Sequence, residues 1–77
     1  MPDIINIRPM DGYFMEVKFS NGSTVILNLA KKLCTVRFSP LRDKSLFQST
    51  TTDGNSIRWN ELIEISATEV FDIAKRN

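Results

Sequence analysis

The sequence of 77 residues contains no histidine, and this limits the chemistry that its other side chains can do. Histidine is the commonest general base near neutral pH, so its absence removes Ser-His and Cys-His nucleophilic pairs. The one cysteine, Cys34, lies near Lys31, Lys32 and Arg37 in the sequence, and cations so placed lower the pKa of a thiol. Because no imidazole can deprotonate it, we expect Cys34 to be a small apolar residue, buried or half-buried.

The acidic residues and the glycines do not form a motif with known chemistry. The nine acids are scattered, and their spacing selects no pair of carboxylates for acid-base catalysis. Gly12, Gly22 and Gly54 lie in three separate turns rather than in one phosphate-binding loop. Asp53-Gly54-Asn55 lacks the further ligands of a calcium loop. We therefore predict no catalytic residue, no cofactor and no metal site, and an enzyme is the least favoured of three hypotheses.

Charge is distributed unevenly along the chain. The net charge is +1, yet the segment 31–44 holds five cations against one acid. A basic segment of this kind can bind phosphates or an acidic protein surface, which makes nucleic-acid binding the second hypothesis. Two other readings stay open, namely a solvated loop and a balance against the acidic C-terminal third. The candidate basic patch consists of Lys31, Lys32, Arg37, Arg42 and Lys44.

Length and composition predict one domain that spans residues 1–77. The 42% apolar content is ordinary for a globular protein, and a single cysteine is typical of a reducing compartment. The first ten residues lack the basic and apolar regions of a signal peptide. No apolar run approaches the ~20 residues that cross a bilayer. We therefore expect a cytoplasmic protein with no membrane partner.

Two alternating runs on either side of Asn21-Gly22 predict a β-hairpin. A two-residue loop would place Val17 opposite Ile26, whereas a three-residue loop over 20–22 places it opposite Val25. A slip of one residue turns a whole strand over, so the more apolar face decides the register. That criterion favours the three-residue loop with Gly22 in a left-handed bulge, although the two-residue loop remains an alternative. The favoured register gathers Tyr13, Met15, Val17, Phe19, Val25, Leu27 and Leu29 on one face.

The opposite face of the same hairpin carries Phe14, Glu16, Lys18, Thr24 and Ile26. If a helix covers the first face, Phe14 and Ile26 are apolar residues on the uncovered side and lie diagonally near each other. Such a patch is typical of a surface that binds a partner protein or a second copy of the chain. The candidate partner surface is therefore Phe14, Ile26, Glu16 and Lys18, and a non-enzymatic protein-interaction module is the leading hypothesis.

The remaining segments predict the other elements. Strand patterns occur at 4–9, 13–19, 24–29, 47–52 and 56–59, with a short sixth at 63–65, and helical turns are expected at 30–34 and 39–42. Ser66 and Glu69 form a capping box before an apolar stripe that includes Val70, Phe71 and Ala74. We expect Trp59 in the core. The predicted fold class is α+β, an antiparallel β-meander or hairpin sheet of about five strands with a C-terminal helix packed on one face.

The pattern Val17-Lys18-Phe19-Ser20-Asn21-Gly22, then Leu27-Asn28-Leu29, Leu41, Phe47, Gly54 and Ile57-Arg58-Trp59, resembles domain-of-unknown-function family 2442. The resemblance covers nearly the whole chain, and its motifs are structural. It implies a small bacterial or phage-type α+β domain. The chain departs from the family where Asn60-Glu61 replaces a Pro-rich step.

The resemblance also has implications for function. Some members are encoded beside another small protein in pairs that look like toxin–antitoxin systems. It therefore implies that this chain is the neutralising or regulatory member of a two-protein pair, with another protein or a second copy as its partner. The family has no established catalytic residues to carry over, and this sequence shows no helix-turn-helix pattern of the kind found in fused relatives.

Overall fold

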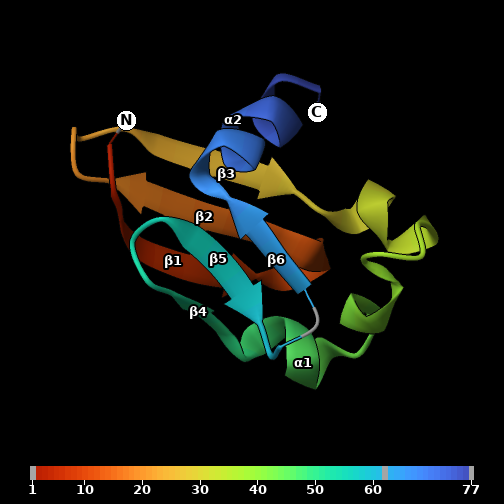
Figure 1. Cartoon of the computed structure of the whole chain (residues 1–77). Coiled ribbons are helices and arrows are strands. Elements are labelled where there is room, and N and C mark those ends of the chain that lie inside the picture. Colours follow the sequence, from red (N-terminus) through yellow and green to blue (C-terminus); the bar gives the residue numbers. More distant parts are fainter. Residues whose placement is uncertain (1, 62, 77) are drawn as a thin grey trace.

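The computed structural model describes residues 2–61 and 63–76, which form two antiparallel sheets of three strands each and two α-helices (Figure 1). The first sheet has the order β1 (Ile4–Met10), β2 (Phe14–Phe19) and β3 (Thr24–Asn28). The second has the order β4 (Thr50–Thr52), β5 (Ser56–Trp59) and β6 (Ile63–Ser66). The α-helices are α1 (Lys44–Gln48) and α2 (Ala67–Arg76), and the 3-10 turns are η1 (Asp11–Tyr13), η2 (Ala30–Cys34) and η3 (Ser39–Arg42).

The α+β class is confirmed, but the prediction of one sheet with about five strands is wrong. The six strands divide between two sheets, because the chain leaves β3 through a connection, residues 29–49, that contains η2, η3 and α1 before β4 begins (Figure 1). The two sheets meet where the N–H of Ile4 donates to the carbonyl of Gly54 at 2.8 Å. A bulge between Ile4 and Asn6 interrupts β1 next to this bond, so the ladder does not continue from one sheet to the other.

The hairpin has the three-residue loop that the apolar alternation favours. Val17 lies opposite Val25, and the N–H of Phe19 donates to the carbonyl of Ser23 at 2.9 Å. Gly22 has φ of 89°, a left-handed value that glycine adopts without the penalty of a Cβ. The loop therefore fixes which side chains of β2 and β3 face the core.

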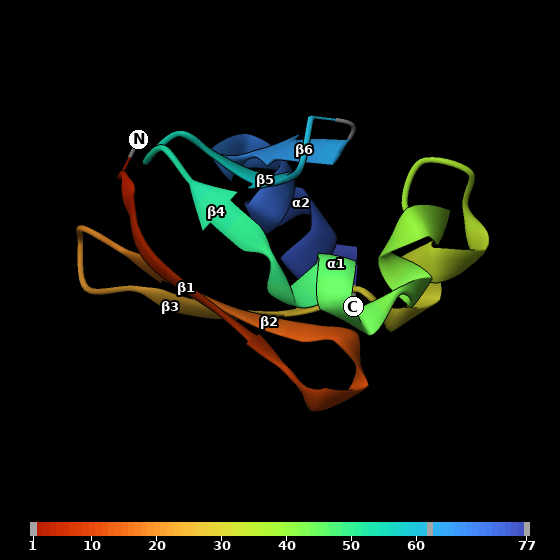
Figure 2. The same ribbon diagram turned by 90° about the horizontal axis from the view of Figure 1, so that it is seen from below.

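One hydrophobic core lies between the two sheets, and α2 closes it on the side of β3 (Figure 2). The first sheet contributes Met15, Val17 and Leu27, all fully buried. The second contributes Trp59, which is also fully buried, and its indole N–H donates to the carbonyl of Phe47 at 3.1 Å. The expected core position of Trp59 is confirmed.

The strand expected at 47–52 is wrong in its first half. Asp43 caps a short helix, because its carboxylate accepts the N–H of Ser45 at 2.9 Å and its carbonyl accepts the N–H of Phe47 at 3.0 Å. Phe47 and Gln48 therefore belong to α1, and only Thr50–Thr52 forms β4. The cap makes the residues before the threonine run helical, whereas the β-branched run itself forms the strand.

The C-terminal helix begins where the capping box predicts. The N–H of Glu69 donates to the hydroxyl of Ser66 at 3.1 Å, and Ala67, Val70 and Ile73 are buried against the core. Phe71 is half-buried, and its ring stacks on Phe19 with centroids 4.8 Å apart.

Candidate partner-binding surface

The outer face of the first sheet holds all four residues of the predicted partner surface. Glu16 is at its centre, paired with Arg8 on β1 and with Ile26 on β3. Lys18 lies opposite Thr24, and Phe14 lies opposite Asn28 on the same face. The register therefore makes Phe14 and Ile26 diagonal neighbours across β2 and β3, as the three-residue loop predicts.

The two apolar side chains of this face are open to solvent. Ile26 is 47% exposed and Phe14 is 37% exposed, and no other described helix or strand covers this side of the sheet (Figure 2). Beside them, a guanidinium nitrogen of Arg8 lies 3.2 Å from a carboxylate oxygen of Glu16. An apolar patch beside an ion pair offers a partner both buried area and a polar rim.

Sequence reasoning missed two members of this surface. Arg8 pairs with Glu16, and the half-buried Met10 lies opposite Phe14. Both were available in the alternation of the first strand, since residues 6, 8 and 10 share one face of β1. We define the outer sheet face as the following set: Arg8, Met10, Phe14, Glu16, Lys18 and Ile26.

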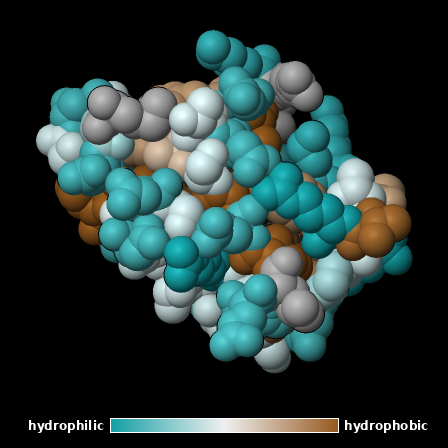
Figure 3. All heavy atoms as spheres, viewed as in Figure 1, coloured by the Kyte–Doolittle hydropathy of each residue, from teal (hydrophilic) through white to brown (hydrophobic). Residues whose placement is uncertain are grey.

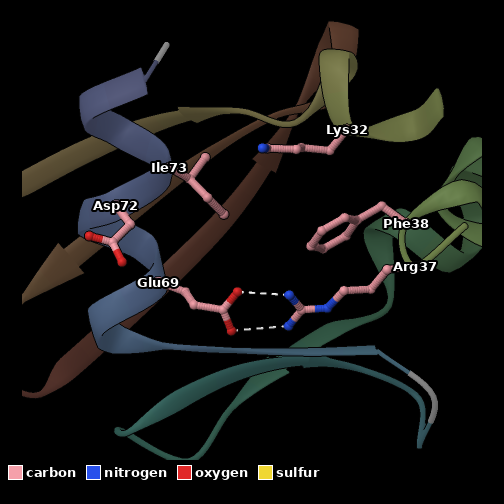
Figure 4. Close-up of a pocket in the computed structure, with 6 residues that line it drawn as sticks. All are labelled: Lys32, Arg37, Phe38, Glu69, Asp72 and Ile73. Carbon is pink, nitrogen blue, oxygen red and sulfur yellow. Dashed lines mark hydrogen bonds and ion pairs between the residues drawn. The ribbon is translucent and has the colours of Figure 1, made fainter. Parts of the chain in front are cut away.

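The basic segment does not present its five cations as one free patch. Both terminal nitrogens of Arg37 bind the carboxylate of Glu69, at 2.8 and 3.0 Å, and one of them also donates to the carbonyl of Glu64 (Figure 4). The hydrogen bond from Arg37, with its charge, lowers the pKa of Glu69, and the same contact raises the pKa of Arg37. Arg37 therefore fastens the loop that follows η2 to the N-terminal turn of α2.

The other cations of the segment point to separate places. The guanidinium of Arg42 donates from Nε to the carbonyl of Leu33 at 3.2 Å. Lys31 and Lys44 are exposed. Lys44 lines a small hollow beside η1, whereas Lys32 lines a different hollow. The sequence cannot show this separation, because it follows from contacts that span up to 32 residues, as in Arg37 with Glu69.

A hollow of about 250 Å³ lies between η2 and α2 (Figure 4). Phe38 and Ile73 are its buried apolar members, and the Arg37–Glu69 pair closes one end. Lys32 reaches across from η2 toward the helix (Figure 4). Asp72 completes the lining, so cations and acids are balanced, and the hollow selects no single sign of ligand charge.

The outer face of the second sheet carries ion pairs centred on Arg58. Arg58 lies 3.3 Å from Asp53 and also binds Glu64. Hydrogen bonds from the N–H groups of Asn55 and Ser56 lower the pKa of Asp53, as does the nearby Arg58. The visible surface over β5 and β6 is mostly hydrophilic (Figure 3).

Cys34 is exposed, so its expected burial is wrong. It ends η2, a turn whose core contact is made by Leu33 instead. Within residues 2–61 and 63–76, no three His, Cys, Asp or Glu side chains are grouped to hold a metal ion. No helix in that part of the chain is long and apolar enough to cross a membrane.

Comparisons of the chain with protein-family models, with curated proteins and with solved structures gave no match.

Proposed function

We propose that this chain is a non-enzymatic protein-interaction module that binds a second protein through the outer sheet face. The observation that carries the proposal is the exposed pair of Phe14 and Ile26 on a sheet face that no described element covers. Exposed apolar residues that are contiguous and rimmed by charge are a feature of binding surfaces, whereas isolated ones are ordinary.

The partner we propose is a small protein, and this chain is the neutralising or regulatory member of the pair. The resemblance to domain-of-unknown-function family 2442 supports that reading, because some members of the family are encoded in toxin–antitoxin-like pairs. The outer sheet face suits such a role, since Arg8, Glu16 and Lys18 offer both signs of charge around the apolar pair.

Nucleic-acid binding is not favoured by the contacts of the basic segment. Arg37 is neutralised by Glu69, and the guanidinium of Arg42 is held by a main-chain carbonyl. Phosphate binding relies on several free cations that act together and gives a steep salt dependence.

The test uses tagged baits expressed in the native organism. The wild-type chain is compared with Phe14→Lys and with Val36→Lys, and all three are first shown to be folded by circular dichroism. Val36 is 94% exposed in the loop before Arg37, so it is a matched apolar-to-lysine control away from the outer sheet face. A captured protein is then purified and its affinity for each bait is measured by calorimetry.

We expect wild type and Val36→Lys to bind the same small protein with equal affinity, and Phe14→Lys to bind at least about tenfold more weakly. If the captured protein comes from the neighbouring gene and is toxic, co-expression with wild type restores growth and co-expression with Phe14→Lys does not. Equal binding by all three baits, or binding of nucleic acid alone, would contradict the proposal.

A further inference from the structure

Among the strand edges of the described residues, the free edge of β3 carries the fewest residues of its own that hinder pairing, and α2 packs beside this strand. Four strands end the two sheets, namely β1, β3, β4 and β6. Three of them carry features that hinder pairing with another chain: β1 has Arg8, Pro9 and a bulge, β6 has Glu64, and β4 is three residues long. β3 is five residues long, and its sequence TVILN contains no charge, no proline and no glycine.

The hydrogen bonds of the hairpin determine which backbone groups of β3 point outward. The bonds from Phe19 to Ser23 and from Leu29 to Tyr13 mark hydrogen-bonded pairs at both ends of the strand. Because such pairs alternate in an antiparallel ladder, Val25 and Leu27 also bond to β2. The N–H and C=O groups of Thr24, Ile26 and Asn28 therefore face away from β2, and no described backbone group is recorded as bonded to those of Thr24 or Ile26.

We propose that a second copy of this chain pairs with this edge, so that β3 and its symmetry mate join two first sheets into one sheet of six strands. The strand is self-complementary about Ile26. In a two-fold antiparallel arrangement Ile26 lies opposite Ile26 of the second copy, and Thr24 lies opposite Asn28. Apolar thus meets apolar and polar meets polar, and no like charges are brought together.

The side chains beside the free edge of β3 also favour a second copy of this chain as the partner. Ile26 is 47% exposed on the outer face, and it adjoins Phe14, so the two-fold axis would join two apolar pairs into one stripe. On the inner face, Val25 is only half-buried. With a net charge of +1, two copies repel each other weakly. The inference goes beyond the proposed function, because it needs the edge of β3 rather than the partner contacts of the outer sheet face.

Sedimentation equilibrium over about 10 μM to 1 mM protein tests this pairing, together with amide hydrogen exchange. We expect a concentration-dependent dimer of twice 8.8 kDa and slower exchange, as the dimer forms, at the N–H groups of Thr24, Ile26 and Asn28. Ile26→Lys places two like charges opposite each other, so it should weaken dimerisation at least about tenfold. Phe14→Lys, the same change on the interior strand β2, should weaken it less.

A second variant guards against loss of the fold. Thr24→Pro removes an N–H group that β2 does not use, and proline is tolerated at sheet edges, so a folded monomer is expected. A wild-type chain that stays monomeric throughout, a dimer that survives Ile26→Lys and Thr24→Pro, or protection confined to other strands would overturn the inference. None of these results touches the proposed function, which is tested separately by whether Phe14→Lys weakens the binding of a partner protein.

Discussion

The two sheets are both antiparallel and three-stranded, but their outer faces carry different side chains. In the first sheet, the central row across the strands is Arg8, Glu16 and Ile26. In the second it is Thr51, Arg58 and Glu64. Each row contains an ion pair, but only the first also leaves a large apolar residue open to solvent.

The difference indicates that small size alone does not explain the exposed pair of Phe14 and Ile26. The chain finishes the second sheet with polar side chains, so a polar outer face is compatible with this fold (Figure 3). An apolar outer face adds nothing to the core of the monomer, whereas buried against a partner it contributes binding energy.

The largest effect we predict lies on the inner faces, where the two sheets share one core. Trp59→Ala should lower the free energy of unfolding by about 3–5 kcal/mol, because it removes a fully buried ring and leaves the carbonyl of Phe47 without its donor. Urea denaturation measures the loss, with Thr51→Ala on the outer side of the same sheet as control. If the first sheet kept its amide protection in Trp59→Ala, the two sheets would not share a core.

How far the sequence could predict this fold depends on whether each feature is local. Alternation around Gly22 gives the hairpin register, and the Ser66 cap with its apolar stripe gives α2. Asp43 is also a local signal, but the threonine run after it led to a strand prediction. The way the two sheets meet depends on the bond between Ile4 and Gly54, 50 residues apart, which no local pattern encodes.

The candidate site was predicted to a similar extent. The outer positions of β2 and β3 follow from the period of two, so Phe14, Glu16, Lys18 and Ile26 were found. The basic patch failed as a single unit because Arg37 is bound by Glu69, a residue on another element. Spacing in the sequence carries no information about such a pair.

Gly22→Ala tests the hairpin register that places Phe14 and Ile26 on the outer face of the first sheet. The φ of 89° is unfavourable for any L-residue with a Cβ, and no atom lies within 4 Å of the added methyl, so the penalty is conformational. We expect the free energy of unfolding to fall by about 1–2 kcal/mol, measured by urea denaturation. A synthetic chain with D-alanine at this position is the control and should be as stable as wild type. Equal losses for the two would show that the loop is not left-handed.

Glu69→Gln tests the ion pair between Arg37 and Glu69 without changing a residue of either outer face. The pKa of Glu69 is lowered in the folded state, so the pair stabilises the protein above the ordinary carboxyl pKa of about 4.3, and this stabilisation is lost as the pH falls through the folded pKa. Because both side chains are partly exposed, we expect the variant to be less stable by only about 0.5–1 kcal/mol at pH 7.

Thermal unfolding from pH 7 down to pH 3 checks the sign of this effect. The stability gap between wild type and Glu69→Gln should close as the pH decreases. A gap that widens in acid would contradict the role given to Arg37.

The smallest effects are predicted on the two outer faces themselves. Ile26→Thr keeps a β-branched side chain at an exposed position, and the free energy of unfolding should change by no more than about 0.5 kcal/mol. Arg58→Ala removes exposed ion pairs of the second sheet and should have an effect of similar size. Differential scanning calorimetry measures both. A large loss with Ile26→Thr would make Ile26 a structural residue rather than a binding one.

The most direct test of the account is amide chemical-shift mapping of the labelled chain bound to its captured and purified partner. We predict that the largest changes fall on β2 and β3, at Phe14, Glu16, Lys18 and Ile26, while Thr51, Arg58 and Glu64 on the second sheet stay near their free values. Changes that cluster on the second sheet or on the segment 31–44, with β2 and β3 unchanged, would contradict the claim that the outer face of the first sheet is the binding surface.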